Sequence, residues 1–230
     1  TVDEHFIKVF EASKKIYAES NGFFDPTVGV LVNAYGFGPG KVVTDLYAER
    51  LDSLNQLVGL NKVRINEDQT VSKENPNVYI DFNAIAKGYT IDLIGQYLED
   101  NGVSDYLIEL GGELKARGKN RSSGKEWLVG IDNPLQDGPE RQFNAKVMLK
   151  NASMATSGNY RKYRLDSITG ERFVHTVNPI TGFAEKSNLL SASVIAENCM
   201  MADGYATALM AMGLDRSASM LKELKSIEVY

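Results

Sequence analysis

The segment Leu189–Gly213, LLSASVIAENCMMADGYATALMAMG, contains two elements that decide the fold. Its first eight residues, 189–196, are apolar or small and carry no charge, which predicts a buried strand. The stretch from about 198 to 213 is rich in alanine, methionine and leucine, which predicts a long helix. A second helix at 215–224 and a short last strand are expected to follow. A buried strand that leads directly into helices indicates a sheet covered by helices.

The rest of the chain mixes helices and strands without a strict βαβ repeat. Apolar residues at spacings of three and four predict an opening helix that ends near Asn21–Gly22. Residues 23–41 predict mainly ordered loop with at most one short helical turn, Thr44 to Gly59 a second helix, and Asn83 to Asp100 a third. Strands are expected at 62–66, 70–73, 78–81, 105–118, 127–132 and 142–150, with a hairpin at 161–177. We therefore expect an α+β fold with mixed or antiparallel sheets packed with helices.

Composition and charge exclude several classes of protein and kinds of site. The 230 residues hold 25 Lys and Arg against 30 Asp and Glu, a net charge of −5, which argues against a broad nucleic-acid-binding face. One cysteine, Cys199, excludes an internal disulfide, and two histidines leave few ligands for zinc. A divalent ion would be Mg²⁺ or Ca²⁺ on oxygen ligands. No apolar run approaches the ~20 residues that cross a bilayer.

The segment Asp81–Tyr89, DFNAIAKGY, combines an acid at a strand end with a lysine in the first turns of a helix. Free N–H groups and the positive dipole end at a helix N-terminus, together with Lys87, form the kind of site that phosphates occupy. The alternative is a structural one, in which Asp81 caps the helix and Lys87 is a surface residue.

A second group of polar residues lies within the apolar helix that contains Asp203. Asp203 and Thr207 are four residues apart, so their oxygens project from one helical face. A buried carboxylate needs a partner, and a hard cation on carboxylate, hydroxyl and carbonyl oxygens would serve. An Asp–Thr hydrogen bond that caps the helix is the alternative.

Three further motifs each have a structural explanation beside a functional one. His175 lies at a strand end before a Pro-Gly turn, which favours either a structural or an acid–base role, whereas His5 is expected to be an ordinary helix residue. The glycines at 36–40 lack the strand and helix that a dinucleotide fingerprint requires. The stretch Gly118–Lys125 has the wrong spacing for a phosphate-binding loop and predicts a hairpin turn.

Taken together, six groups of residues in order along the chain resemble the FAD:protein FMN transferase family, the ApbE-type flavin transferases. They are Gly22–Gly29 with Leu31–Gly38, Asp81–Tyr89 with Asp92, Glu109–Glu113, Ala155–Gly158 with Tyr160, His175–Gly182, and Ala202–Ala208. The resemblance implies an ApbE-like, T-fold-like architecture. It departs at Asn178 and Ile180, where the family usually has Asp and Arg.

The resemblance also implies roles for particular residues. The residues that match the family's FAD-contacting positions are Phe23, Phe24, Asp25, Tyr35, Asp81, Lys87 and the main chain of Val177. The metal ligands fall on the Ala84 carbonyl, Asp203 and Thr207. His175 or Asp203 would act as the catalytic acid or base.

The implied activity is the Mg²⁺-dependent transfer of FMN from FAD to a Ser or Thr hydroxyl of an acceptor protein, with release of AMP. Hydrolysis of FAD to FMN and AMP, or FAD binding without catalysis, are the alternatives. Residues 1–230 are expected to form a single flavin-transferase catalytic domain that lacks its N-terminal part. By the same resemblance the protein is expected at the extracytoplasmic face of a bacterial membrane, held by an anchor outside this chain, as in a lipoprotein. We expect no nucleic-acid partner.

Overall fold

A five-stranded antiparallel sheet in the order β11–β10–β7–β4–β3 organises the structure, which is a computed structural model. It describes residues 1–40, 48–136, 141–158, 163–165, 172–174, 176–184 and 188–230. The sheet strands are β3 (Tyr106–Leu110), β4 (Glu113–Arg117), β7 (Ser153–Gly158), β10 (Ser191–Ala196) and β11 (Glu228–Val229). β10 and β7 form the longest pairing at the centre, from Ser191 opposite Gly158 to Ala196 opposite Ser153.

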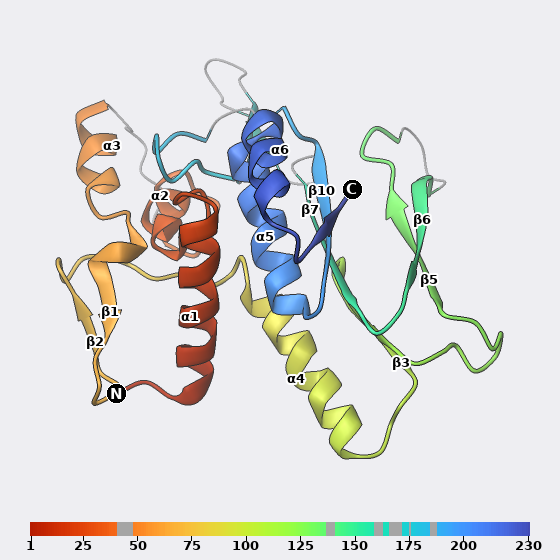
Figure 1. The fold of residues 1–230 in the computed structure, drawn as a ribbon. Helices are drawn as coiled ribbons and strands as arrows, with labels where there is room; N and C mark the ends of the chain where they lie inside the picture. The colour runs from red at the N-terminus through yellow and green to blue at the C-terminus, as the bar shows by residue number, and fades with distance from the viewer. Residues whose placement is uncertain (41–47, 137–140, 159–162, 166–171, 175, 185–187) are drawn as a thin grey trace.

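Helix α5 (Cys199–Met212) lies at the centre of the molecule (Figure 1). It packs against β7 and β10 on one side, against α1 (Glu4–Glu19) on another, and against α4 (Ala86–Asp100). The side-chain oxygen of Asn198 accepts a hydrogen bond from the Met201 N–H at 2.9 Å and caps its first turn. Gly213, with a φ of 73°, ends α5, and α6 (Leu214–Glu223) begins at the next residue.

Shorter elements surround this centre. Three two-stranded antiparallel sheets, β1–β2, β5–β6 and β8–β9, lie outside the main sheet. Their strands are β1 (Val63–Ile65), β2 (Val71–Lys73), β5 (Trp127–Asp132), β6 (Phe143–Leu149), β8 (Tyr163–Leu165) and β9 (Arg172–Val174). The remaining helices are η1 (Pro26–Val28), α2 (Gly29–Ala34), α3 (Ala48–Asn55) and η2 (Leu60–Lys62). In Figure 1, β1–β2 and β5–β6 lie on opposite sides of the central layers.

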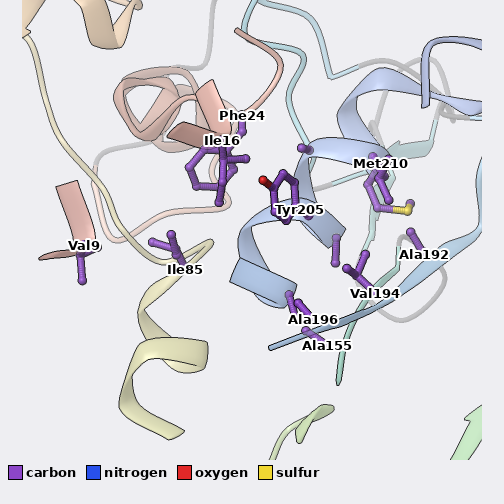
Figure 2. Packing of buried hydrophobic residues seen from close by; sticks show 14 residues of the cluster. Val9, Ile16, Phe24, Ile85, Ala155, Ala192, Val194, Ala196, Tyr205 and Met210 are labelled. Carbon is purple, nitrogen blue, oxygen red and sulfur yellow. The ribbon is translucent and has the colours of Figure 1, made fainter. Parts of the chain in front are cut away.

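The main hydrophobic core surrounds α5 (Figure 2). Tyr205 and Met210 of α5 are each only 1% exposed and pack in one cluster with Ile16 of α1 and Val194 of β10. The Tyr205 hydroxyl donates a hydrogen bond to the Glu19 carboxylate, so the polar end of this buried ring has a partner. A helix that is buried on every side is apolar all round, and Asp203 is the only charged residue in α5.

Several expected elements are confirmed. The opening helix is α1, the helix expected at Asn83–Asp100 is α4, and the strand at 189–196 is β10, followed by two helices and a short strand as expected. The stretch Gly118–Lys125 forms a tight turn, closed by pairing between Asn120 and Lys125. The α+β class with antiparallel sheets is correct.

Two expected strands were wrong, and two further regions hold more regular structure than expected. Residues 78–81 pair with no strand in the described part of the chain, because the Asp81 N–H donates to the Pro26 carbonyl at 2.8 Å instead. The expected strand 105–118 is two strands, since Gly111 and Gly112 both have positive φ and form a hairpin turn. Residues 26–34 form η1 and α2, which is more helix than the single short turn expected there, and β7 is a strand that the sequence did not predict. The cap proposed at Thr44 lies outside the described residues.

No described helix is both long enough and apolar enough to cross a membrane.

Candidate functional site

A pocket of about 860 Å³ brings together residues that are far apart in the sequence. A volume of this size suits a small-molecule or cofactor site. Of the residues predicted to contact FAD, it is lined by Phe23, Phe24, Asp25, Asp81, Lys87 and Val177. All three proposed metal ligands, Ala84, Asp203 and Thr207, also line it. The pocket therefore joins the chain around η1, the start of α4 and one face of α5.

Asp203 is a buried carboxylate at this pocket. Its side chain is carried by the apolar helix α5, and the residue is only 3% exposed. Its Oδ2 accepts a hydrogen bond from the Gly88 N–H at 3.0 Å. Burial raises the pKa of Asp203 from 3.8 to about 7, and the neighbouring Glu113 carboxylate also raises it, whereas the Gly88 N–H and Lys87 oppose the shift. The charged form of such a buried carboxylate would be strongly stabilised by a cation at the pocket.

The first turn of α4 receives its cap from another helix. Ile85 occupies the N-cap position and supplies no side-chain hydrogen bond, so Asp203 takes the role that a local Ser or Asp side chain usually has. In regular helical geometry the Gly88 N–H would donate to the carbonyl of Ala84. Because it donates to Asp203, the Ala84 carbonyl accepts no hydrogen bond from any described residue. This carbonyl oxygen and the Asp203 carboxylate thus become available at the same pocket.

Gly88 makes the close approach of α4 and α5 possible. A Cβ at this position would lie 2.3 Å from the Cys199 carbonyl oxygen and 2.9 Å from Asp203 Cβ. These distances are shorter than real Cβ contacts, and the first of them is to main chain that cannot move aside easily. Glycine at 88 is therefore required for the Asp203–Gly88 hydrogen bond.

Lys87 forms an ion pair with Glu113 across the pocket. Lys87 Nζ lies 2.6 Å from Glu113 Oε2, and the two side chains are 47% and 4% exposed. The Gly111–Gly112 turn places Glu113 at the start of β4. Glu113 belongs to the segment Glu109–Glu113, which resembles the family, but no role is predicted for it from the sequence. The two adjacent glycines before a strand were the signal that could have identified it.

Thr207 and Ser157 form the hydroxyl side of the pocket. Their oxygens lie 3.5 Å apart, and Ser157 comes from β7, the strand that packs against α5. Asp203 and Thr207 share the pocket-lining face of α5, as their spacing predicts. The alternative explanation, a hydrogen bond between Asp203 and Thr207, does not occur among the described contacts.

The two other predicted aspartates are held by hydrogen bonds within the protein. Asp25 Oδ1 accepts from the Thr27 N–H at 2.8 Å and its hydroxyl at 2.6 Å, and Oδ2 accepts from the Leu60 N–H at 3.1 Å. Burial raises the pKa of Asp25 above its ordinary value, although these hydrogen bonds and the Lys62 charge oppose the rise. Asp81 Oδ1 accepts from the Asn83 N–H at 2.8 Å, so it organises the turn before α4 without acting as the N-cap.

The aromatic residues divide between the pocket and its surroundings. Phe24 is 2% exposed. The Arg216 guanidinium lies over the Phe23 ring, 5.1 Å from the ring centroid. Tyr35 is not among the described residues that line the pocket, and its hydroxyl donates to the Gly182 carbonyl at 3.2 Å. Phe37, two residues further on, does line it.

His175 lies outside the described residues. The two residues that follow it, Thr176 and Val177, line the pocket, and Val177 is 4% exposed. The chain directly after His175 therefore forms part of the pocket wall.

The donor set suits a hard divalent cation. No group of three or more His, Cys, Asp or Glu side chains in the described part of the chain is arranged to hold a metal ion. A metal site here would rest on one carboxylate, one hydroxyl and one main-chain carbonyl, with further ligands from substrate or water. All of these are oxygen ligands, which Mg²⁺ and Ca²⁺ prefer. The buried Asp203 carboxylate and the Ala84 carbonyl without an internal donor fit such an ion.

Fold and pocket together define an α+β protein with a cofactor-sized pocket, a lysine at the N-terminus of a helix and an all-oxygen donor set. The sequence pattern of the ApbE family matches residues 1–230, and the chain belongs to this family.

Relatives and solved structures agree with this assignment. The chain is 36% identical to the FAD:protein FMN transferase of Haemophilus influenzae, covering 100% of this chain and 66% of that protein. It is 32% identical to the Escherichia coli K12 protein of the same name, covering 100% and 65%. The flavin transferase ApbE from Vibrio cholerae superposes with a TM-score of 0.86 at 31% identity, covering 100% of this chain and 71% of that one. The Pseudomonas stutzeri flavinyl transferase ApbE superposes with a TM-score of 0.85 at 31% identity, covering 99% of this chain and 69% of that one. The chain thus spans just under two thirds of the length of these two curated relatives.

Proposed function

We propose that this chain binds FAD in the large pocket and transfers its FMN part to a Ser or Thr hydroxyl of an acceptor protein, releasing AMP. The observation that carries the proposal is the arrangement of Lys87, the α4 N-terminus and the buried Asp203 around one pocket. A lysine and a helix N-terminus attract a pyrophosphate, while Asp203 and its oxygen neighbours suit the cation that accompanies it. The names of the relatives support the same activity.

The proposed reaction is a phosphoryl-type transfer. The acceptor hydroxyl oxygen attacks the phosphorus on the riboflavin side of the pyrophosphate and forms a new P–O ester bond. The bond from that phosphorus to the bridging oxygen breaks, and AMP leaves with this oxygen. The hydroxyl proton passes to a base of the protein. Positioning and charge neutralisation dominate such reactions, because the protein does little covalent chemistry itself.

Asp203, Thr207 and the Ala84 carbonyl would hold Mg²⁺, which neutralises charge on pyrophosphate oxygens when it is bound. Lys87, in the first turn of α4, would contribute a positive charge to the same oxygens. Its ion pair with Glu113 keeps the ammonium group at the pocket when no substrate is present. Ca²⁺ is the alternative ion for the same ligands.

His175 and Asp203 are the two candidates for the base. A pKa of about 7 would suit Asp203 for proton transfer, but a carboxylate that binds a cation is a weaker base. We therefore assign the metal to Asp203 and proton transfer to His175, whose neighbours Thr176 and Val177 line the pocket.

Transfer to water is the second candidate function. The Lys87 side chain is 47% exposed, so water reaches the groups that would bind the pyrophosphate. A water molecule in place of the acceptor hydroxyl would give FMN and AMP from the same pocket.

One incubation separates these functions. The protein is mixed with FAD, Mg²⁺ and a candidate acceptor protein, and AMP, free FMN and acceptor-bound flavin are measured separately. Transfer gives AMP and flavin on the acceptor in equal amounts, and hydrolysis gives AMP and free FMN. Intact FAD that stays bound contradicts both and leaves a flavin-binding protein. The control is the same mixture with a chelator of divalent cations.

The proposed location follows from the resemblance alone. We propose that the protein acts at the extracytoplasmic face of a bacterial membrane, through an anchor outside this chain. Fractionation of cells that make the full gene product, with immunodetection in each fraction, tests this location.

A further inference from the structure

A second pocket lies next to the first, at the junction of α5 and α6. Its volume is about 420 Å³, and its described lining includes Asn178, Asn188, Met212, Gly213, Leu214 and Arg216. The positive φ of Gly213 breaks the helix here and turns α6 away from α5, so the pocket opens where the two helices separate.

The two pockets share a wall. Thr176 and Ala211 line both of them. Arg216 of the second pocket also lies with its guanidinium 5.1 Å from the ring centroid of Phe23, which lines the first. A group seated in the second pocket therefore lies directly beside the first pocket.

Hydrogen bonds hold the walls of the second pocket in place. Asn178 is 5% exposed, and its side-chain Oδ1 accepts a hydrogen bond from the Ile180 N–H at 2.9 Å. The main-chain N–H of Asn178 donates to the Phe183 carbonyl at 2.9 Å. Asn188 Oδ1 accepts from the Leu214 N–H at 2.8 Å. Walls fixed in this way lose little conformational entropy when something binds between them.

The described part of the lining has little net charge and includes an exposed apolar side chain. Asp215 and Arg216, one acid and one base, are the charged residues among the described lining of this pocket. Leu214 also lines it, and its side chain is 53% exposed. The described lining residues therefore favour an uncharged ligand with some apolar surface over an anion or a cation.

We infer that this second pocket is where the acceptor polypeptide docks, with its Ser or Thr hydroxyl reaching the FAD pocket between Thr176 and Ala211. The inference rests on the proposed function. A Ser or Thr side chain is short, so the main chain of the acceptor has to pass close to the flavin phosphate. An extended segment advances about 3.3 Å per residue and therefore needs a groove beside the phosphate, which the second pocket supplies. Its lining selects a segment whose residues around the hydroxyl are uncharged.

Leu214→Asp is the variant that tests this docking site. Leu214 is the first residue of α6, where an acidic side chain is favourable for the helix, so the variant is expected to fold. A charge on the pocket wall should raise the KM for the acceptor by about tenfold or more without changing FAD affinity. The release of FMN to water in the absence of any acceptor should stay at the wild-type rate. Leu128→Asp is the matched control, since Leu128 is 58% exposed on β5 and lines neither pocket.

The probes are short synthetic peptides with one central threonine. One set has Ala, Gly and Leu around the threonine, a second has Lys and a third has Glu, and FMN attachment is measured by mass spectrometry. A further peptide with a photoreactive leucine next to the threonine is cross-linked and mapped. The inference predicts modification of the uncharged set, loss in Leu214→Asp but not in Leu128→Asp, and cross-links within residues 210–216.

The possible results separate the inference from the function on which it rests. If the wild-type protein forms neither free FMN nor flavin-peptide, the proposed function fails and the docking site fails with it. If wild-type protein releases FMN but modifies no peptide, or if Leu214→Asp modifies the peptides as well as wild type does, only the docking site is overturned. Preference for either charged set, or cross-links elsewhere, also overturns it.

Discussion

Asp92 of α4 and Asp203 of α5 each accept hydrogen bonds from the first turn of the other's helix. Asp92 takes the N–H groups of Cys199 and Met200 at 3.0 and 2.8 Å, and Asp203 takes the N–H of Gly88 at 3.0 Å. Lys115 neutralises Asp92 at 2.8 Å. The Asp203 carboxylate has no such close cation among the described residues, because Lys87 pairs with Glu113. The two helices are thus fixed against each other by one neutralised carboxylate and one that remains available to a metal.

Gly88→Ala should disrupt this arrangement. The new Cβ would meet the Cys199 carbonyl at 2.3 Å, so α4 and α5 must separate and the Gly88–Asp203 hydrogen bond must lengthen. Overpacking of this kind costs about 1–3 kcal/mol of folding free energy. We expect a lower urea midpoint and loss of Mg²⁺ binding, measured by denaturation and calorimetry.

Gly95→Ala on the same helix is the control. A Cβ there would meet Lys115 side-chain carbons at 2.9 and 3.0 Å and the Tyr106 hydroxyl at 2.8 Å, which are the outer parts of side chains. Alanine also has a higher helix propensity than glycine. Equal losses of Mg²⁺ binding in both variants would show that Gly88 has no special role.

The fold was predictable where the local pattern was strong. α1, α4, α5 and β10 each have a clear apolar pattern, and the structure contains all of them. β7 was missed because Ser153–Gly158, SMATSG, consists largely of small and polar residues that do not favour strands by themselves. Its partners β4 and β10 and the covering helix α5 make it a strand, and tertiary context of that kind is not contained in a six-residue window.

The site was predictable in its residue types and partly in its partners. Spacing placed Asp203 and Thr207 on one helical face, and the structure places both at the pocket. The cap that Asp203 gives to α4 spans 115 positions in sequence, and no local pattern could indicate it. The Lys87–Glu113 ion pair likewise depends on the β3–β4 hairpin, for which the sequence pattern predicts one continuous strand.

Asp203→Asn should remove one pH-dependent contribution to the stability of the metal-free protein. Folded Asp203 keeps its proton up to a pKa of about 7, whereas in the unfolded chain the pKa is near 3.8. The folded state therefore binds the additional proton between these values, and the free energy of unfolding falls as the pH rises from about 4 to about 7. This loss is on the order of a few kcal/mol. The asparagine variant loses this dependence, so without metal it should be more stable than wild type at about pH 8.

Urea unfolding with chelator at several pH values measures this difference. The asparagine side-chain oxygen can still accept the Gly88 N–H, so the variant keeps the contact between helices. Asp52→Asn, at an exposed position of α3, controls for the change in net charge. Parallel pH curves for wild type and Asp203→Asn would contradict the assigned pKa.

Metal binding should depend more on Asp203 than on Thr207. Asp203→Asn removes the only negative charge among the three proposed ligands, while Thr207→Ala removes a neutral hydroxyl that water can replace. We expect Mg²⁺ to stabilise wild type strongly, Thr207→Ala less, and Asp203→Asn not at all. Thermal melting over a series of Mg²⁺ concentrations tests this order. Ser157→Ala, whose hydroxyl touches Thr207 at 3.5 Å, should respond to Mg²⁺ as wild type does. An Asp203→Asn protein with the wild-type Mg²⁺ response would exclude this site.

His175→Gln should slow the transfer of FMN by about 10²–10⁴-fold, the contribution of a general acid or base. FAD affinity, measured by flavin fluorescence, should stay unchanged because the proposed binding groups are elsewhere in the pocket. His5→Gln is the natural control, since His5 is the other histidine of the chain and its Nδ1 bonds the Tyr89 hydroxyl at 2.8 Å. Full activity in His175→Gln, or a melting temperature well below that of wild type, would favour a structural role.

Lys87 pairs with Glu113 and is proposed to bind the pyrophosphate, and a double-mutant cycle can separate these two roles. Lys87→Ala removes the cation beside Glu113, whose side chain is only 4% exposed, and a buried carboxylate without a partner is costly. It also removes a charge-assisted contact to the pyrophosphate, worth roughly 1–3 kcal/mol of FAD affinity. In the pair Lys87→Ala with Glu113→Gln the buried charge is gone, so stability should recover while FAD affinity stays low. FMN has no pyrophosphate and should bind wild type more weakly than FAD, with less loss in the variants. Calorimetric titration of FAD and FMN into all four proteins, with urea midpoints for each, gives both quantities. If FAD affinity recovers together with stability in the double variant, Lys87 acts only through Glu113, and the α4 N-terminus would not hold the pyrophosphate through this lysine.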